Sequence, residues 1–441
     1  MLNNLKKTDP QIYKLVKEEE KRQIDVLEMI PSENYTSKAV RDALSSVLTN
    51  KYSEGYAGKR YYQGNEFADG VEELAITRAK KLFGVPFVNV QPYSGSPANA
   101  EIYMSILKPG EKMMGLALDH GGHITHGLNI GFSGTFYKTA HYQVNKITRQ
   151  LDYDEIENEV LKEKPQLLIC GFTAYSRIIN WKRFREIADK ANCWLMADMS
   201  HITGLVVGGV HPSPVPYVDV VMTTTHKTLR GPRGAMIMVT DRGLKKDPEI
   251  TKRINTNVFP GLQGGPHDNT TAAIAVALLE ASKPAFKKYA AQIVKNAKAL
   301  AEELTKLGFE VVSKGTDNHL VLVDLQKQKV SGKIAAEALE VAGIVLNYNL
   351  VPYDVMPPFY TSGIRMGTPA LTTRGMKEKD MKKIASWMER VINEVKGYSL
   401  PSEKEGRLKL LEKFRKEVIK NENLLKIKKE VTLFARKFPV P

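Results

Sequence analysis

Three polar residues, Thr173, Asp198 and Lys227, each follow the end of a short apolar run. Apolar runs of this length that alternate with helical patterns are typical of buried strands in a parallel sheet. Ligands of an open parallel sheet bind outside the carboxyl ends of its strands. We therefore expect these three side chains to face one crevice.

An acid and a lysine in one buried crevice suit pyridoxal phosphate. That cofactor needs a lysine for a Schiff base and an acid opposite its pyridine nitrogen, so that the ring can withdraw electrons from the substrate Cα. Lys227 and Asp198 are the candidates. The alternative is a buried ion pair between the same two side chains, and the spacing alone does not separate the two interpretations.

The segment around Lys227 favours the cofactor. Residues 223–234 place several hydroxyls, one histidine and two arginines around a glycine turn, directly after an apolar run. Among small and polar neighbours, the pKa of Lys227 can be depressed, which makes the amine a better nucleophile.

Ser94 and Gly95 precede a helical run at 97–107. Backbone N–H groups at a helix N-terminus bind phosphate, so this turn is a candidate for the phosphate of the cofactor. The same turn is also explained as an ordinary helix cap.

His120, His123 and His126 recur at every third residue, as metal ligands sometimes do. The run is rich in glycine rather than helical, and no cysteine or group of carboxylates completes a ligand shell. We therefore expect no metal.

The elements that must hold these residues alternate between helix and strand. The predicted helices cover 72–83, 97–107 and 181–191, and the predicted strands cover 166–170, 194–197, 218–223 and 235–239. This alternation indicates an α/β fold with a large, mostly parallel sheet covered by helices on both faces.

Other elements are predicted before and after this region of the chain. An amphipathic helix at 286–307, capped by Gly308, opens a smaller α+β region with strands at 309–313 and 319–325 and a helix at 332–342. Upstream, residues 11–28 are predicted to form a helix, and 31–70 to form polar aromatic loops typical of a site. We divide the chain into an N-terminal helical arm with site loops (1–70), a large α/β domain (71–281), and a small α+β domain with a basic helical C-terminal extension (282–441).

The composition is that of a globular protein. The 441 residues are 42% hydrophobic and 26% charged, which excludes disordered, collagen-like and disulfide-rich classes. Cys170 and Cys193 lie in apolar runs and are expected to be reduced core thiols. No run approaches the roughly 18 apolar residues of a membrane helix, and the N-terminus has no apolar signal core. We expect a cytoplasmic protein without a membrane partner.

The net charge of +15 raises the question of an anionic partner. Aromatic residues do not alternate with the basic ones in the C-terminal extension, as a base-stacking surface would require. We expect small-molecule substrates and no nucleic acid, and a basic nucleic-acid-binding protein is the more distant alternative.

Several longer motifs, in order along the chain, resemble the serine hydroxymethyltransferase (glycine hydroxymethyltransferase) family of fold-type-I pyridoxal phosphate enzymes. They are PSENYTS at 31–37, NKYSEGY at 50–56, GKRYY at 58–62, HGGHITHG at 120–127, AYSR at 174–177, VMTTTHKTLRGPRG at 221–234, FPGLQGGP at 259–266 and GIRMGTPA at 363–370. The resemblance runs from about residue 24 to about residue 390 and implies transfer of the hydroxymethyl carbon of L-serine to tetrahydrofolate or a related tetrahydropterin, giving glycine. It also implies a homodimer or a tetramer.

The resemblance assigns roles to individual residues. At the cofactor, Lys227 forms the Schiff base and Asp198 pairs with the pyridine nitrogen. His123 stacks on the ring, and His201 and Thr173 lie near the phenolate oxygen. The phosphate is bound by Ser94 and Gly95, together with Tyr52, Gly264 and Gly265 of a second subunit. At the substrates, Arg365 and Ser32 bind the carboxylate, Glu54 and Tyr62 handle protons and the substrate hydroxyl, and Tyr61, Leu118, Gly122, Ile124 and Asn349 line the pterin pocket.

Four residues, Pro31, Gln63, Asp119 and Pro357, depart from those usual in the family at the entrance and the pterin side. They bear on the choice of one-carbon carrier and amino-acid substrate. The nearer alternative is therefore a pterin-independent aldolase acting on 3-hydroxy amino acids, or a 2-methylserine hydroxymethyltransferase.

Overall fold

The computed structural model describes residues 3–357, 359–398, 400–401 and 403–441. Contacts divide the chain into two compact units. The large unit holds Asn34–Val294 and Thr316–Leu320, and the small unit holds Met1–Glu33, Lys295–Gly315 and Val321–Pro441. The domain limits expected from the sequence, after residues 70 and 281, stay a prediction.

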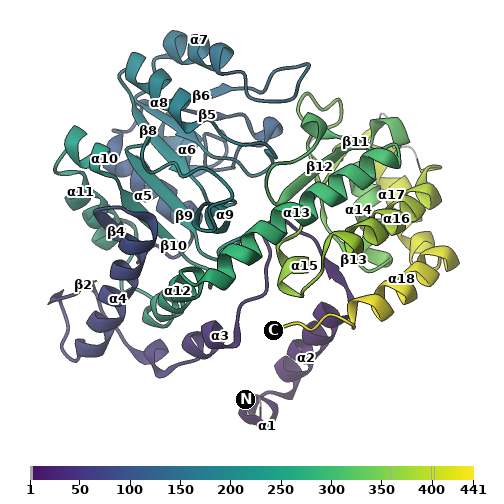
Figure 1. Ribbon diagram of the computed structural model, residues 1–441, viewed down its shortest axis with the longest axis horizontal. Helices are drawn as coiled ribbons and strands as arrows, with labels where there is room; N and C mark the ends of the chain where they lie inside the picture. Colours follow the sequence, from purple (N-terminus) through teal and green to yellow (C-terminus); the bar gives the residue numbers. More distant parts are fainter. Residues whose placement is uncertain (1–2, 358, 399, 402) are drawn as a thin grey trace. The chain divides into compact units, whose positions relative to one another are not determined.

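The large unit is built on a seven-stranded sheet (Figure 1). Its strands lie in the order β4 (Phe87–Asn89), β10 (Ala235–Val239), β9 (Val220–Thr224), β8 (Trp194–Asp198), β7 (Leu167–Cys170), β5 (Lys112–Leu116) and β6 (Lys138–Tyr142). Strands β9, β8, β7, β5 and β6 run parallel, and β10 is antiparallel to both of its neighbours. The predicted α/β fold with a mostly parallel sheet is confirmed.

Successive residues of the central strands pack into two different cores. Met196 joins the core that contains residues of α5 (Gly95–Ile106) and α11 (Ile250–Thr256), whereas Ala197 joins the core that contains residues of α8 (Trp181–Lys190). The central strands β7, β8, β9 and β10 are buried on both faces and consist mainly of apolar residues. This is why the sequence predicted these four strands as apolar runs.

The large unit also contains helices and short strands outside this sheet. They are α3 (Lys38–Leu44), η1 (Val47–Asn50), β2 (Gly55–Tyr56), β3 (Lys59–Arg60), α4 (Glu66–Phe83), η2 (Leu118–His120), α6 (Phe132–Phe136), α7 (Tyr153–Glu163), α9 (Thr203–Val207), α10 (Asp241–Lys246), η3 (Asn257–Leu262) and α12 (Asp268–Ala281). The following helix, α13 (Pro284–Lys306), begins in the large unit and ends in the small one. Helices predicted at 72–83, 97–107, 181–191 and 286–307 are confirmed.

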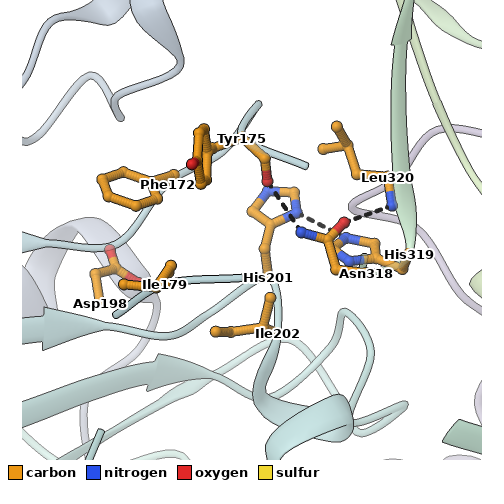
Figure 2. A pocket seen from close by; sticks show the side chains of 9 residues that line it. All are labelled: Phe172, Tyr175, Ile179, Asp198, His201, Ile202, Asn318, His319 and Leu320. Atoms are coloured by element: carbon orange, nitrogen blue, oxygen red, sulfur yellow. Dashed lines mark hydrogen bonds between the residues drawn. The ribbon is translucent and has the colours of Figure 1, made fainter. Parts of the chain in front are cut away.

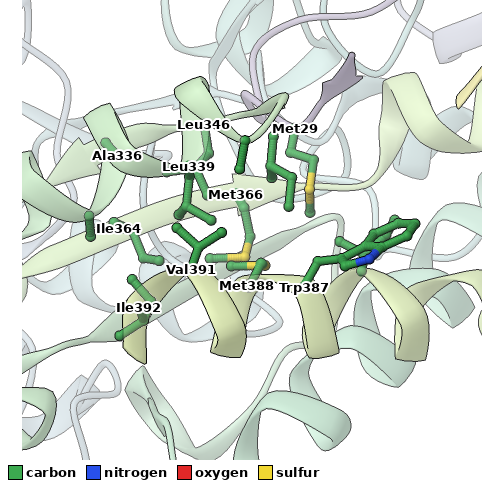
Figure 3. Packing of buried hydrophobic residues seen from close by; sticks show 14 of the residues in the cluster. Met29, Ala336, Leu339, Leu346, Ile364, Met366, Trp387, Met388, Val391 and Ile392 are labelled. Atoms are coloured by element: carbon green, nitrogen blue, oxygen red, sulfur yellow. The ribbon is translucent and has the colours of Figure 1, made fainter. Parts of the chain in front are cut away.

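The small unit packs helices on a four-stranded sheet of order β11 (Glu310–Val311), β12 (Leu320–Asp324), β15 (Gly363–Gly367) and β14 (Asn347–Asn349). Figure 3 shows Leu339, Met366 and Val391 together in its core. Its other elements are α1 (Asn3–Thr8), α2 (Pro10–Asp25), β1 (Leu27–Glu28), η4 (Val312–Lys314), η5 (Gln326–Gln328), α14 (Gly332–Val341), β13 (Ile344–Val345), α15 (Pro369–Thr373), α16 (Glu378–Val395), α17 (Lys404–Val418) and α18 (Glu422–Ala435).

A buried arginine ties both ends of the chain into the small unit. The Arg374 guanidinium donates to the carbonyl oxygens of Val26 at 2.7 Å and of Ala435 at 2.6 Å. One of its nitrogens also donates to the carbonyl of Phe438 at 2.9 Å. Val26 and Phe438 follow the ends of α2 and α18, and Ala435 is the last residue of α18. The guanidinium therefore bonds carbonyls that have no partner within a helix.

The strand predicted at 309–313 is wrong in its second half. Only Glu310 and Val311 pair with β12, and a 3-10 turn follows at Val312–Lys314. Ser313 and Lys314 have φ angles of 58° and 59°, which are incompatible with an extended strand.

Cys170 and Cys193 are buried and unbridged, as expected from the sequence. Among the described residues, no helix combines the length and the apolar character needed to span a bilayer.

Candidate active site

Asp198 is the last residue of β8, and its carboxylate is held by three hydrogen bonds. Its Oδ2 atom lies 3.1 Å from His126 Nε2 and accepts a bond of 3.2 Å from Asn99 Nδ2. Its Oδ1 atom accepts a bond of 3.1 Å from the backbone N–H of Ser200. The strand end therefore presents an acid whose orientation is fixed from two sides.

The charge of Asp198 is stabilised in spite of its burial. Burial alone would raise its pKa, but the hydrogen bond from His126, electrostatic interactions with the His126 and His123 rings and the nearby Lys227 amine outweigh that effect and lower the pKa below its ordinary value. Asp198 is thus a buried carboxylate that stays ionised, which is the state required to keep a pyridine nitrogen protonated.

Lys227 lies in a loop that the backbone holds rigidly. The carbonyl of Lys227 accepts a bond of 3.0 Å from Asn34 Nδ2, and Thr225 N donates to Gly234 O at 3.1 Å across the base of the loop. The next residue, Thr228, donates from its hydroxyl to the carbonyl of His201 at 2.9 Å. Lys227 itself is only 9% exposed.

His123 is joined to Asp198 through a chain of hydrogen bonds, and Thr173 bonds the turn that precedes His123. Thr173 Oγ1 donates to Gly122 O at 2.9 Å, which fixes the turn before His123. His123 Nδ1 lies 2.7 Å from Thr125 Oγ1, and that oxygen also accepts a bond of 2.8 Å from Asn99 Nδ2, the atom that bonds Asp198. The structure therefore brings these predicted cofactor residues into one network.

The N-terminus of α5 forms a cradle next to β9. Ser94 is the N-cap residue of α5, and its side chain makes no capping hydrogen bond to the described residues of this helix. A Cβ atom on Gly95 would lie 2.8 Å from Thr224 Cγ2, so only glycine leaves this approach open. Thr224 Oγ1 is buried and, within the described residues, has no hydrogen-bond partner. An orphaned hydroxyl beside free helix N–H groups fits a phosphate group.

His226 is a site residue that the sequence analysis named only as part of the loop. Burial, followed by the charges of Lys227 and Arg233, lowers its pKa to about 3, so its ring is neutral. Its Nδ1 atom is buried without a hydrogen-bond partner in the part of the chain that the structure describes. In the sequence, only its position directly before Lys227 indicated that His226 lies near the site.

A second group of predicted residues gathers on the surface of the same unit. Tyr52 OH donates to Glu54 Oε1 at 3.2 Å, and the rings of Tyr52 and Tyr62 meet edge to face at 5.5 Å between centroids. A Cβ atom on Gly264 would lie 3.3 Å from Glu54 Oε1, and one on Gly265 would lie 3.4 Å from Tyr52 Cε1. The charge of Glu54 and this hydrogen bond raise the pKa of Tyr52.

Three of the predicted pterin residues of the large unit have exposed side chains, and the fourth, Gly122, is buried. Leu118 and Ile124 are 38% and 52% exposed, and Tyr61 is 71% exposed with its ring 5.6 Å from that of Phe259. Gly122 lies between them in a tight turn, where a Cβ atom would lie 1.9 Å from Leu116 O.

The remaining predicted residues, Ser32, Asn349 and Arg365, belong to the small unit. Arg365 lies on β15, where its Nε atom donates to Asn347 Oδ1 at 3.1 Å. Burial lowers the pKa of its guanidinium to about 10, which still leaves it charged at neutral pH. A half-buried, charged guanidinium is suited to a carboxylate ligand.

His201 lies in a small pocket that Asp198 also lines (Figure 2). Its Nδ1 atom lies 3.2 Å from Nε2 of His319, a residue that the sequence analysis did not single out. The pocket is closed by Phe172, Tyr175, Ile179, Ile202, Asn318 and Leu320.

Comparisons with known proteins match this chain to one family. The family model described as serine hydroxymethyltransferase matches residues 5–388. A protein of that name from Desulfotalea psychrophila is 54% identical over 389 residues, which cover 88% of this chain and 90% of the relative. A protein of the same name from Legionella pneumophila is 49% identical over 436 residues, which cover 99% of this chain and 98% of the relative. Another from Methanosarcina barkeri is 50% identical over 410 residues, which cover 93% of this chain and 98% of the relative.

Proposed function

This chain belongs to the serine hydroxymethyltransferase family, and on that premise we propose which of its side chains bind the reactants and move protons. Its activity is pyridoxal-phosphate-dependent transfer of the hydroxymethyl carbon of serine to tetrahydrofolate, which gives glycine. The family match favours this activity over the nucleic-acid-binding alternative suggested by the net charge.

Lys227 and Asp198 would hold the cofactor. When bound, pyridoxal phosphate withdraws electrons from the substrate Cα, so that the bond to the hydroxymethyl carbon can break. Lys227 Nζ would bind it covalently, and Asp198 would keep a proton on its pyridine nitrogen. The observation that carries this proposal is the ionised, buried Asp198 carboxylate, fixed by His126, Asn99 and the Ser200 N–H.

The phosphate of the cofactor would bind at the N-terminus of α5. Ser94 and Gly95 offer backbone N–H groups there, and the buried Thr224 hydroxyl supplies one further donor. His123 would stack on the ring, and Thr173 and His201 would lie near its phenolate oxygen. These three residues would hold the ring in one orientation for the reaction.

Glu54 and Tyr62 would manage the protons of the reaction. A carboxyl that exchanges a proton can accept one from the substrate hydroxyl and return one to the pterin. The bond from Tyr52 fixes one carboxylate oxygen of Glu54 and leaves the other for this exchange.

Arg365 would bind the substrate carboxylate with its two parallel N–H groups, assisted by Ser32. Tyr61, Leu118, Gly122, Ile124 and Asn349 would line the pterin pocket. The exposed apolar side chains of Leu118 and Ile124 support that role, because a flat heteroaromatic ring binds well between apolar surfaces.

Formation of glycine from serine, measured with and without tetrahydrofolate, tests the proposed site. We expect turnover only when the pterin is present, and we expect Lys227→Ala to abolish it. Equal glycine formation without the pterin, or efficient cleavage of other 3-hydroxy amino acids alone, would instead support the aldolase alternative.

The active unit is proposed to be a homodimer, with Tyr52, Gly264 and Gly265 of one subunit reaching the phosphate held by the other. Each Lys227→Ala or Glu54→Gln homodimer should be nearly inactive. If the sites are composite, mixing the two variants should restore part of the activity, because one site of the mixed dimer then holds both intact residues. A fully active monomer in sedimentation would contradict the proposal.

We also propose a cytoplasmic location. The two buried, unbridged cysteines support a reducing compartment. Fractionation of cells that carry the protein tests this location.

A further inference from the structure

A short segment from the C-terminal third of the chain is built into the large unit. Thr316–Leu320 belongs to that unit, although the residues before and after it belong to the small one. Asp317 N donates to Ser176 O at 2.8 Å, and Asn318 Nδ2 donates to Tyr175 O at 3.0 Å. An ion pair of 3.2 Å joins Arg177 to Asp317. These bonds hold the segment at Asp317 and Asn318, directly before His319.

The anchored segment presents His319 to His201 (Figure 2). His201 Nδ1 and His319 Nε2 lie 3.2 Å apart, and the two rings stack with 5.4 Å between centroids and 24° between planes. His319 is 1% exposed and His201 is 5% exposed. The pair is therefore a buried contact between two imidazoles in a pocket that Asp198 lines.

The contact couples the tautomers of the two rings. A neutral imidazole carries hydrogen on one nitrogen and a lone pair on the other. If His319 Nε2 carries hydrogen, His201 Nδ1 must accept it, and the second nitrogen of His201 must carry its own hydrogen. If His201 Nδ1 donates instead, its Nε2 is left as a lone pair. Two buried rings in contact cannot both be charged without a large electrostatic cost.

We propose that His319 is a positioning residue that donates to His201 Nδ1 and so keeps His201 neutral with hydrogen on Nε2. This inference rests on the proposed function, in which His201 lies near the phenolate oxygen, an acceptor. His201 then acts as a hydrogen-bond donor and not as a base.

Nitrogen-15 NMR of the full-length chain, labelled in its nine histidines and measured with and without pyridoxal phosphate, tests this proposal. Spectra of His201→Asn and His319→Phe assign the two rings. We expect His201 to show an unprotonated Nδ1 and a protonated Nε2 in both states. A hydrogen on His201 Nδ1 would overturn the proposal.

Two matched substitutions separate donation from packing. His319→Phe keeps a flat ring but removes the donor, whereas His319→Gln keeps an N–H donor. We expect His319→Phe to give a mixture of His201 tautomers and to lower kcat about tenfold or more, with KM for serine changed much less. His319→Gln should restore the single tautomer and most of kcat. An unchanged His201 spectrum and kcat in His319→Phe would contradict the role.

The outcomes also separate this inference from the proposed function. If His319→Phe does not fold, the spectra of the native chain and of His319→Gln still decide the tautomer. A native chain that turns over serine with tetrahydrofolate but carries hydrogen on His201 Nδ1 refutes only the role of His319. A native chain without pterin-dependent turnover refutes the proposed function, whichever nitrogen carries the hydrogen.

Discussion

His126 Nε2 lies 3.1 Å from Asp198 Oδ2, and both side chains are buried although they are 72 positions apart in the chain. His126 supplies a hydrogen bond to a carboxylate whose pKa burial alone would raise. Its ring therefore stabilises the ionised form of Asp198, on which the proposed binding of the cofactor depends.

Removing this donor should weaken cofactor binding. His126→Phe keeps the ring volume but loses the bond, so the pKa of Asp198 should rise and the affinity for pyridoxal phosphate should fall by about 10- to 100-fold, the usual range for a hydrogen bond to a charged group. Titration of the apoprotein with pyridoxal phosphate measures this effect. His211→Phe is the control, because His211 is a buried histidine that bonds Pro212 O instead. Equal losses in both variants would mean that His126 only supports packing.

The cradle at Gly95 predicts a substitution and its rescue. Gly95→Ala places a Cβ atom 2.8 Å from Thr224 Cγ2, and the stiff, β-branched threonine cannot move away easily. The affinity for the cofactor should therefore fall. Adding Thr224→Ser removes the clashing methyl but keeps the hydroxyl, so the double variant should bind more tightly than Gly95→Ala alone. Calorimetric titration with pyridoxal phosphate checks the order, and a double variant no better than the single one would contradict it.

Glu101 predicts how stability depends on pH. This residue of α5 is fully buried, and within the described residues neither carboxyl oxygen has a hydrogen-bond partner. Burial raises its pKa from 4.5 to about 8. Between these values the folded chain holds a proton that the unfolded chain has lost, so stability falls as pH rises, by up to about 1.4 kcal/mol per pH unit.

Glu101→Gln should remove this dependence, because an amide has no proton to lose. The Tm of the variant, relative to that of the native chain, should be higher at pH 8.5 than at pH 5. Glu73→Gln, at an exposed position of α4, is the control and should leave the pH dependence unchanged. Parallel Tm curves for Glu101→Gln and the native chain would show that Glu101 is ionised in the folded state.

Glu54→Gln should separate proton transfer from binding. Glutamine Oε1 can still accept the bond from Tyr52 OH, so the loop keeps its geometry, but the amide cannot exchange a proton. Binding of serine and of the cofactor should persist, while pterin-dependent turnover should fall by about 10² to 10⁴. Loss of cofactor in step with activity would indicate that Glu54 only orders the loop.

The sequence was informative where local pattern and chemistry coincide. Strands buried on both faces are continuous apolar runs, so the elements that carry Asp198 and Lys227 could be predicted. The sequence analysis did not predict strands β4, β5 and β6. β4 has only three residues, and β5 and β6 contain polar residues such as Lys112 and His141. Long motifs assigned the site residues by resemblance.

Contacts between distant residues could not be predicted. Nothing in the spacing of His126 indicates that it meets Asp198, because a parallel sheet brings loops together that are far apart in the chain. The same is true of His319 and His201, which are 118 positions apart. Ser313 was misassigned because a positive φ angle in a non-glycine residue leaves no clear signal in the sequence.

Identification of the lysine that binds the cofactor tests the central claim most directly. Borohydride fixes pyridoxal phosphate to that lysine, and peptide mapping by mass spectrometry then locates the pyridoxyl group. We expect it on Lys227, in the peptide that follows β9, and we expect Lys227→Arg to carry no label. Stoichiometric label on another lysine of the native chain would contradict the site described for this chain.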